Sequence, residues 1–99
     1  MKIMLEKLKN ATKVKLVPID GRKSFYGKCC ALELGKDKYL KSYDTIVCGI
    51  VDGVFVRYWD DYSDTTMRHI NAFLDKYDYP LLNKKYWHTF PVCNLIVKG

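Results

Sequence analysis

The sequence lacks the features that mark membrane spans and zinc sites. No apolar run approaches the length of about 18 residues that a membrane-spanning helix needs, so we expect no membrane partner. The four cysteines include no Cys-x-x-Cys pair, and the adjacent Cys29 and Cys30 would point to opposite faces of a strand. With no signal peptide and no secretory cysteine framework, we expect reduced thiols and a cytoplasmic location.

Repeats, linkers and low-complexity segments are also missing, so residues 1–99 are expected to form a single domain. The net charge of +6 is unevenly distributed along this domain. Residues 1–41 hold eleven Lys or Arg against four acids, whereas residues 42–80 hold three against seven. The basic early part favours a nucleic acid or another anionic partner, and the acidic middle argues against a uniform phosphate-binding surface.

The first half of the chain has the alternating pattern of strands. Residues 12–19 predict a strand that ends or lies at a sheet edge because Pro18 cannot donate to a ladder. Residues 24–34 and 39–43, joined by a turn at residues 35–37, predict a hairpin.

A second hairpin is predicted over residues 45–59, because Asp52-Gly53 lies between apolar runs and suits a type I′ turn. We expect Val51 to pair with Val54. The valine face that includes Gly49 is expected to pack against a helix, and Arg57 is expected to mark the other face as partly exposed.

The main helix is predicted at residues 64–77, with Ser63 as its N-cap. Arg68 follows Asp64 by four positions, so we expect an exposed ion pair between them. Asn83 is expected to cap a short helix through residue 88, and residues 1–10 have the spacing of another short helix. The sequence therefore predicts an α+β fold: a small antiparallel sheet of about five strands in two hairpins, packed against one main helix, with short N-terminal and C-terminal helices.

Two groups of residues are candidates for binding. The start of the main helix contributes Tyr62, Thr65, Arg68 and His69, where free backbone N–H groups favour an anion. Ordinary capping and a packed histidine explain the same residues. The first hairpin interleaves basic and aromatic residues, which suit a nucleic acid or a protein interface: Arg22, Lys23, Tyr26, Lys28, Lys38, Tyr39, Lys41 and Tyr43.

Catalysis is not favoured by any spacing in the chain. His69 invites a general acid or base interpretation, yet no nucleophile or second carboxylate is placed with it. Asp60, Asp61 and Asp64 resemble a divalent-ion cluster, but three acids at a helix N-terminus are more simply a dipole-favoured cap. We therefore predict a protein with no enzymatic activity, no metal and no cofactor.

Three strings carry a resemblance to a known family: Ser42-Tyr43-Asp44-Thr45-Ile46-Val47, the segment Tyr62-Ser63-Asp64-Thr65-Thr66-Met67-Arg68-His69-Ile70, and Asn83-Lys84-Lys85-Tyr86-Trp87. Over residues 40–92 the chain resembles small uncharacterised proteins of phages and mobile elements of Gram-positive gut bacteria. The resemblance supplies no active site. It implies an accessory protein acting inside a bacterial host cell, where small phage proteins often block defence systems by occupying a surface, as anti-CRISPR proteins do.

We expect, on this basis, a non-enzymatic phage or mobile-element protein that binds a host protein or protein–nucleic-acid complex, a defence inhibitor being one form. The alternative is a small basic nucleic-acid-binding module that contacts DNA or RNA with the same first hairpin. The sequence leaves the oligomeric state open.

Overall fold

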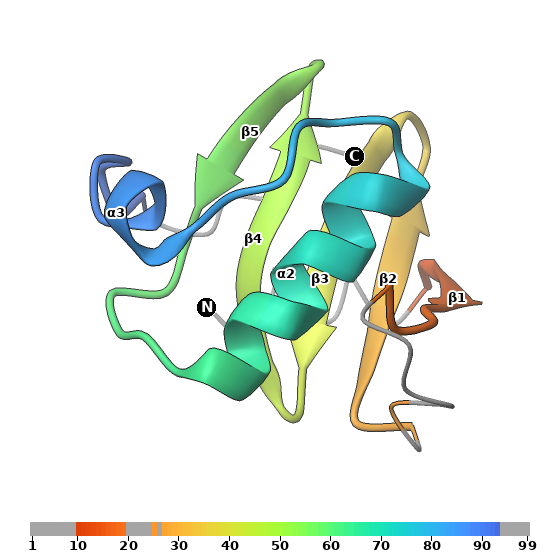
Figure 1. Cartoon of the computed structure of the whole chain (residues 1–99). Helices are drawn as coiled ribbons and strands as arrows, with labels where there is room; N and C mark the ends of the chain where they lie inside the picture. The colour runs from red at the N-terminus through yellow and green to blue at the C-terminus, as the bar shows by residue number, and fades with distance from the viewer. Residues whose placement is uncertain (1–9, 20–24, 26, 94–99) are drawn as a thin grey trace.

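The computed structural model describes residues 10–19, 25 and 27–93 and forms one sheet with a helix across it (Figure 1). The antiparallel strands lie in chain order from β1 to β5, and α2 covers one face. The elements are β1 (Thr12–Lys15), β2 (Cys29–Leu34), β3 (Asp37–Ser42), β4 (Thr45–Val51), β5 (Val54–Arg57), α2 (Asp64–Lys76) and α3 (Lys84–Trp87). The α+β prediction is confirmed. The helix predicted over residues 1–10 lies almost wholly outside the described residues.

The strand β1 lies at one edge of the sheet and ends before Pro18, as predicted. The next predicted strand is too long, because β2 begins only at Cys29. Gly27 before it adopts a φ of 76°, and the N–H of Lys28 donates to the carbonyl of Phe25 in a turn. The glycine therefore marks the turn into the strand.

The β4–β5 hairpin has the predicted register, with Val51 opposite Val54, but the opposite face packs against the helix. Asp52 and Gly53 have φ values of 53° and 79°, as a type I′ turn requires. The core against α2 contains Cys48 and Ile50. The prediction that the Gly49 face packs on the helix is therefore wrong.

Two tyrosine rings occupy the space above Gly49, on the face away from α2. A Cβ at Gly49 would lie 3.0 Å from Cδ1 of Tyr39 and 3.3 Å from Cε2 of Tyr58. A β-bulge changes which side chains of β4 point towards α2. Leu40 pairs with Cys48, whereas Lys41, the next residue of β3, pairs with Ile46. A sequence pattern of uninterrupted alternation does not show this shift.

The helix α2 begins as predicted. Ser63 caps it, and its side chain accepts a hydrogen bond from the N–H of Thr66 at 3.0 Å. The predicted ion pair between Asp64 and Arg68 does not form: Asp64 accepts from the Tyr62 hydroxyl at 2.8 Å. The guanidinium of Arg68 lies 3.4 Å from the Thr65 hydroxyl instead. No helix among the described residues is long and apolar enough to cross a membrane.

Arg57 occupies the corner between β5 and α3, and it is only 5% exposed. Its Nε donates to the carbonyl of Trp59 at 2.8 Å, and its Nη1 donates to the carbonyls of Trp87 and Phe90 at 3.2 and 3.1 Å. The guanidinium also lies 4.6 Å from the Trp87 ring centroid. The prediction that Arg57 marks a partly exposed face is therefore wrong. Arg57 instead donates to carbonyls at and just after the C-terminal end of α3. Asn83 caps the N-terminus of α3, as predicted.

Candidate functional site

A groove lined by four lysines lies at the end of the sheet where β2 begins and β1 and β3 end. It has a volume of about 380 Å³, and we call it the lysine groove. Its lining is Lys13, Val14, Lys15, Gly27, Lys28, Cys29, Cys30, Lys41 and Tyr43. The groove brings together three members of the predicted binding set, Lys28, Lys41 and Tyr43.

The pairing of three strands places two of these lysines on one face. Lys15 pairs with Cys30, and Cys30 pairs with Lys41, so the three side chains form a row across the sheet. Two strand spacings separate the outer pair by about 10 Å. Lys13 precedes Lys15 by two residues and therefore shares its face. Sequence analysis missed Lys13 and Lys15 as site residues, although their shared parity was a visible signal.

Among the described residues that line the lysine groove there is no carboxylate. Among the residues that the structure describes, the four lysines form no ion pair, whereas Lys36 and Asp52 pair at 3.0 Å at the opposite end of the sheet. Like charges gathered without compensation raise the local positive potential and attract anions.

Two cysteines, Cys29 and Cys30, line the groove. Cys29 offers no reactive thiolate at neutral pH. Burial, with a smaller contribution from Cys30, raises the pKa of the Cys29 thiol to about 12. The Cys29 side chain therefore stays protonated and packs in the core against α2. Cys30 lies between Lys15 and Lys41 on the other face.

Tyr43 follows β3 at the rim of the groove. Its side chain is 53% exposed and its φ is 54°, a left-handed conformation that bulky residues rarely adopt. The N–H of Tyr43 donates to the carbonyl of Lys28 at 2.7 Å, which ties the turn after β3 to the turn before β2. The structure therefore fixes the tyrosine beside two lysines of the groove.

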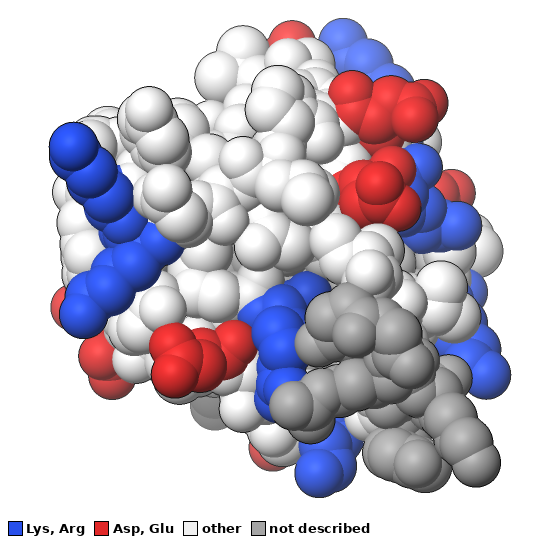
Figure 2. Space-filling view, viewed as in Figure 1, with Lys and Arg blue, Asp and Glu red and all other residues white. Residues whose placement is uncertain are grey.

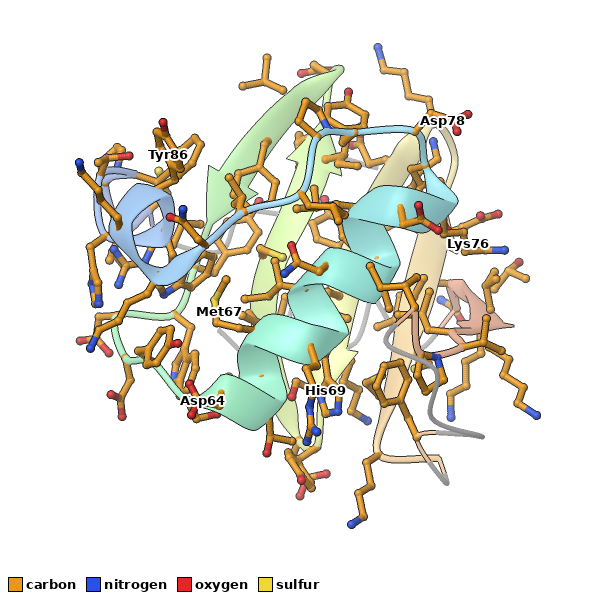
Figure 3. All side chains as sticks on the ribbon, in the orientation of Figure 1. Asp64, Met67, His69, Lys76, Asp78 and Tyr86 are labelled. Atoms are coloured by element: carbon orange, nitrogen blue, oxygen red, sulfur yellow. The ribbon has the colours of Figure 1, made fainter. Side chains whose placement is uncertain are left out.

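His69 comes from α2 (Figure 3), and its ring centroid lies 5.8 Å from that of Tyr43. It is 1% exposed, and its Nδ1 is 2.7 Å from the Ser42 hydroxyl. Burial first, then the charges of Arg68 and Lys28, lower the pKa of the imidazole. The predicted site at His69 is therefore not a surface site, and the packed histidine is the interpretation that the structure confirms.

The other predicted helix-start residues lie apart from the groove. The Tyr62 hydroxyl donates a hydrogen bond to Asp64. The ammonium of Lys84 lies over the Tyr62 ring, 5.1 Å from the ring centroid. Thr65 and Arg68 contact each other on α2. The Nε of Arg68 is buried and has no hydrogen-bond partner among the described residues.

Tyr39 is fully buried, so its predicted role as an exposed ring for binding is wrong. Burial raises the pKa of its phenol, and the ring stacks on Tyr58 with centroids 6.3 Å apart. Lys38 points to the helix side, where its ammonium lies over the Tyr77 ring. Arg22, Lys23 and Tyr26 lie outside the described residues.

The helix side of the molecule has a different surface. Figure 2 shows acidic and basic side chains close together there, and a broad uncharged area over β5 and the segment between α2 and α3. Exposed apolar side chains in this part of the chain include Val54, Leu81 and Tyr86. A mainly apolar pocket of about 170 Å³ lies among Phe55, Leu74, Tyr79, Pro80, Leu82 and Phe90.

The comparisons with known proteins identify a family but no characterised relative. No curated protein and no solved structure matches the chain. The sequence model of a family of unknown function, DUF8033, matches residues 14–88, a span that runs from β1 to the end of α3 and contains all of the lysine groove except Lys13. The expectation of an uncharacterised family is thus confirmed, and the chain belongs to DUF8033.

Proposed function

We propose that this protein is a non-enzymatic accessory protein of a phage or mobile element that binds nucleic acid in the cytoplasm of its bacterial host. The observation that carries the proposal is the lysine groove: four lysines and an exposed tyrosine line one cavity, and the lining residues that the structure describes include no carboxylate. Lysines that neutralise backbone phosphates release counterions, which supplies affinity without requiring any base sequence.

The groove takes its charge from the basic first part of the chain. All four of its lysines come from the basic first part, residues 1–41, and no acid of the middle part is among the described residues that line the groove, although the exposed Asp44 follows Tyr43 at the rim. The acidic middle therefore places no carboxylate inside the described part of this groove. The non-enzymatic part of the proposal is supported by the burial of His69 and the raised pKa of Cys29.

The test is a titration of the protein into labelled DNA and RNA at low salt. We expect micromolar binding that the double variant Lys28→Glu/Lys41→Glu weakens by at least about tenfold, since two phosphate contacts become repulsive. The matched control is Lys84→Glu/Lys85→Glu on α3, which changes the net charge by the same amount, from +6 to +2. Absence of binding by the wild-type protein, or equal weakening by both variants, contradicts the proposal.

A second candidate function is inhibition of a host-defence protein complex through the apolar surface. It is favoured by Val54 and Leu81, which are 61% and 53% exposed, and by the neighbouring apolar pocket that Phe55 and Leu82 line. Aromatic and aliphatic groups of this kind form the centre of protein interfaces. In an affinity pulldown from bacterial lysate treated with nuclease, this function predicts a retained host protein that is lost with Leu81→Asp and kept with Lys28→Glu/Lys41→Glu.

A further inference from the structure

We propose that the lysine groove selects single-stranded nucleic acid and that Tyr43 is the surface on which an unpaired base stacks. The inference rests on the proposed function, and it adds the class of strand and a residue that contacts a base. It comes from the conformation and surroundings of Tyr43 rather than from the lysine charges.

The backbone of Tyr43 is in a conformation that its side chain disfavours. A φ of 54° is ordinary for glycine and common for asparagine or aspartate in turns, whereas a tyrosine there is an outlier. The side chain is also 53% exposed, so burial does not account for the residue. Conformational strain of this kind is concentrated at binding sites, where the rest of the structure holds it in place.

The structure holds Tyr43 from two sides. Its N–H is bonded to the carbonyl of Lys28 at 2.7 Å, and its ring centroid lies 5.8 Å from that of His69 at an angle of 50°. His69 is itself fixed by Ser42 and by the edge-on ring of Phe25 at 4.8 Å. The Tyr43 ring is thus exposed but supported, so little side-chain freedom is lost when a base stacks on it.

The position of the ring relative to the ammonium groups suits a single strand. Tyr43, Lys28 and Lys41 line the same groove, so one base can contact the ring while the neighbouring phosphates contact the lysines. Every base has a π-face, and stacking on tyrosine is therefore tolerant of sequence. In a duplex the bases are stacked on each other and their faces are not available to the ring. The lysines alone would accept either form of nucleic acid.

The experiment compares the affinities of wild-type protein and tyrosine variants for three labelled probes at one salt concentration. The probes are oligothymidylate and oligouridylate of about 20 nucleotides, longer than the sites of about 4–16 nucleotides typical of small binding domains, and a duplex of the same length. We expect the single strands to bind at least fivefold more tightly than the duplex. Tyr43→Ala should weaken single-strand binding by about 5- to 100-fold and leave duplex binding unchanged.

Two further variants separate stacking from other effects. Tyr43→Phe keeps the ring and should retain most of the single-strand affinity. Tyr86→Ala removes a tyrosine of similar exposure, 57%, from the outer side of α3 (Figure 3), and it should change nothing. Thermal unfolding of each variant shows that it is folded at the temperature of the titration.

The outcomes distinguish this inference from the function on which it rests. Preference for single strands that is lost in Tyr43→Ala and kept in Tyr43→Phe and Tyr86→Ala supports the inference. Equal affinity for duplex and single strand, or Tyr43→Ala binding like the wild type, overturns the inference while the lysine groove remains a nucleic-acid site. Binding of none of the three probes at low salt overturns the proposed function and the inference with it.

Discussion

The corner around Arg57 and the lysine groove hold positive charge in opposite ways. Arg57 is buried, and its Nε, its Nη1 and the face of its guanidinium each have a defined partner: three carbonyls and the Trp87 ring. The groove gathers four lysines that have no ion-pair partner among the described residues, and it has a strained tyrosine at its rim. The corner is built for stability. The groove leaves its charge unpaired among the described residues, as the proposed binding of nucleic acid requires.

The largest effect on stability is expected from Arg57→Ala. It leaves the carbonyl of Phe90 without a donor, leaves that of Trp87 with only the backbone N–H of Phe90, and removes the contact with the Trp87 ring, so the free energy of unfolding should fall by about 3 kcal/mol. Urea denaturation measures it. Lys36→Ala, which breaks an exposed ion pair, serves as the control with no measurable change. A loss for Arg57→Ala as small as that of the control would remove the distinction between the two regions.

A smaller effect is expected from the conformation of Tyr43. Glycine adopts a positive φ without strain whereas alanine does not, so Tyr43→Gly should be more stable than Tyr43→Ala by about 1 kcal/mol. The comparison uses two variants that both lack the ring, so lost contacts cancel. Equal stability of the two variants would show that the turn is not left-handed at this position in solution.

The smallest effect on stability concerns His69. Its imidazole is buried, and the positive charges of Arg68 and Lys28 disfavour its protonation. Its folded pKa lies below the ordinary value, so the unfolded chain binds a proton first as the pH falls. Stability should therefore be full above pH 6.5 and decline as the pH drops below it towards the folded pKa. Urea midpoints between about pH 8 and pH 5 measure the decline. His69→Asn should flatten this part of the profile; an unchanged profile would argue against a buried neutral histidine.

Local signals in the sequence were sufficient for the β4–β5 turn and for the starts of the two helices, but not for the start of β2. Asp52-Gly53 determined the register at Val51 and Val54, and the oxygen side chains of Ser63 and Asn83 determined where α2 and α3 begin. These features depend on neighbouring residues alone. They are therefore recoverable from a single chain.

Which face of the sheet packs against α2 could not be predicted from the sequence, because it depends on contacts between distant segments. Both sides of the β4–β5 hairpin are apolar, so the pattern does not say which side meets α2, and the bulge in β4 changes the alternation. Tyr39 was misplaced for the same reason. Arg57 was misread because its partners, Trp87 and Phe90, are 30 and 33 residues away. The groove itself needed β1 to pair beside β2, which brings Lys15 into line with Lys41.

The most direct test of the account is the salt dependence of single-strand binding by wild-type protein and the two charge variants. If all four lysines contact phosphates, log K should fall with log salt concentration with a slope of about −3. The slope should become shallower by at least about 1.4 in Lys28→Glu/Lys41→Glu and stay near the wild-type value in Lys84→Glu/Lys85→Glu. Identical slopes in the two variants, which carry the same net charge, would contradict the claim that the lysine groove is the binding site.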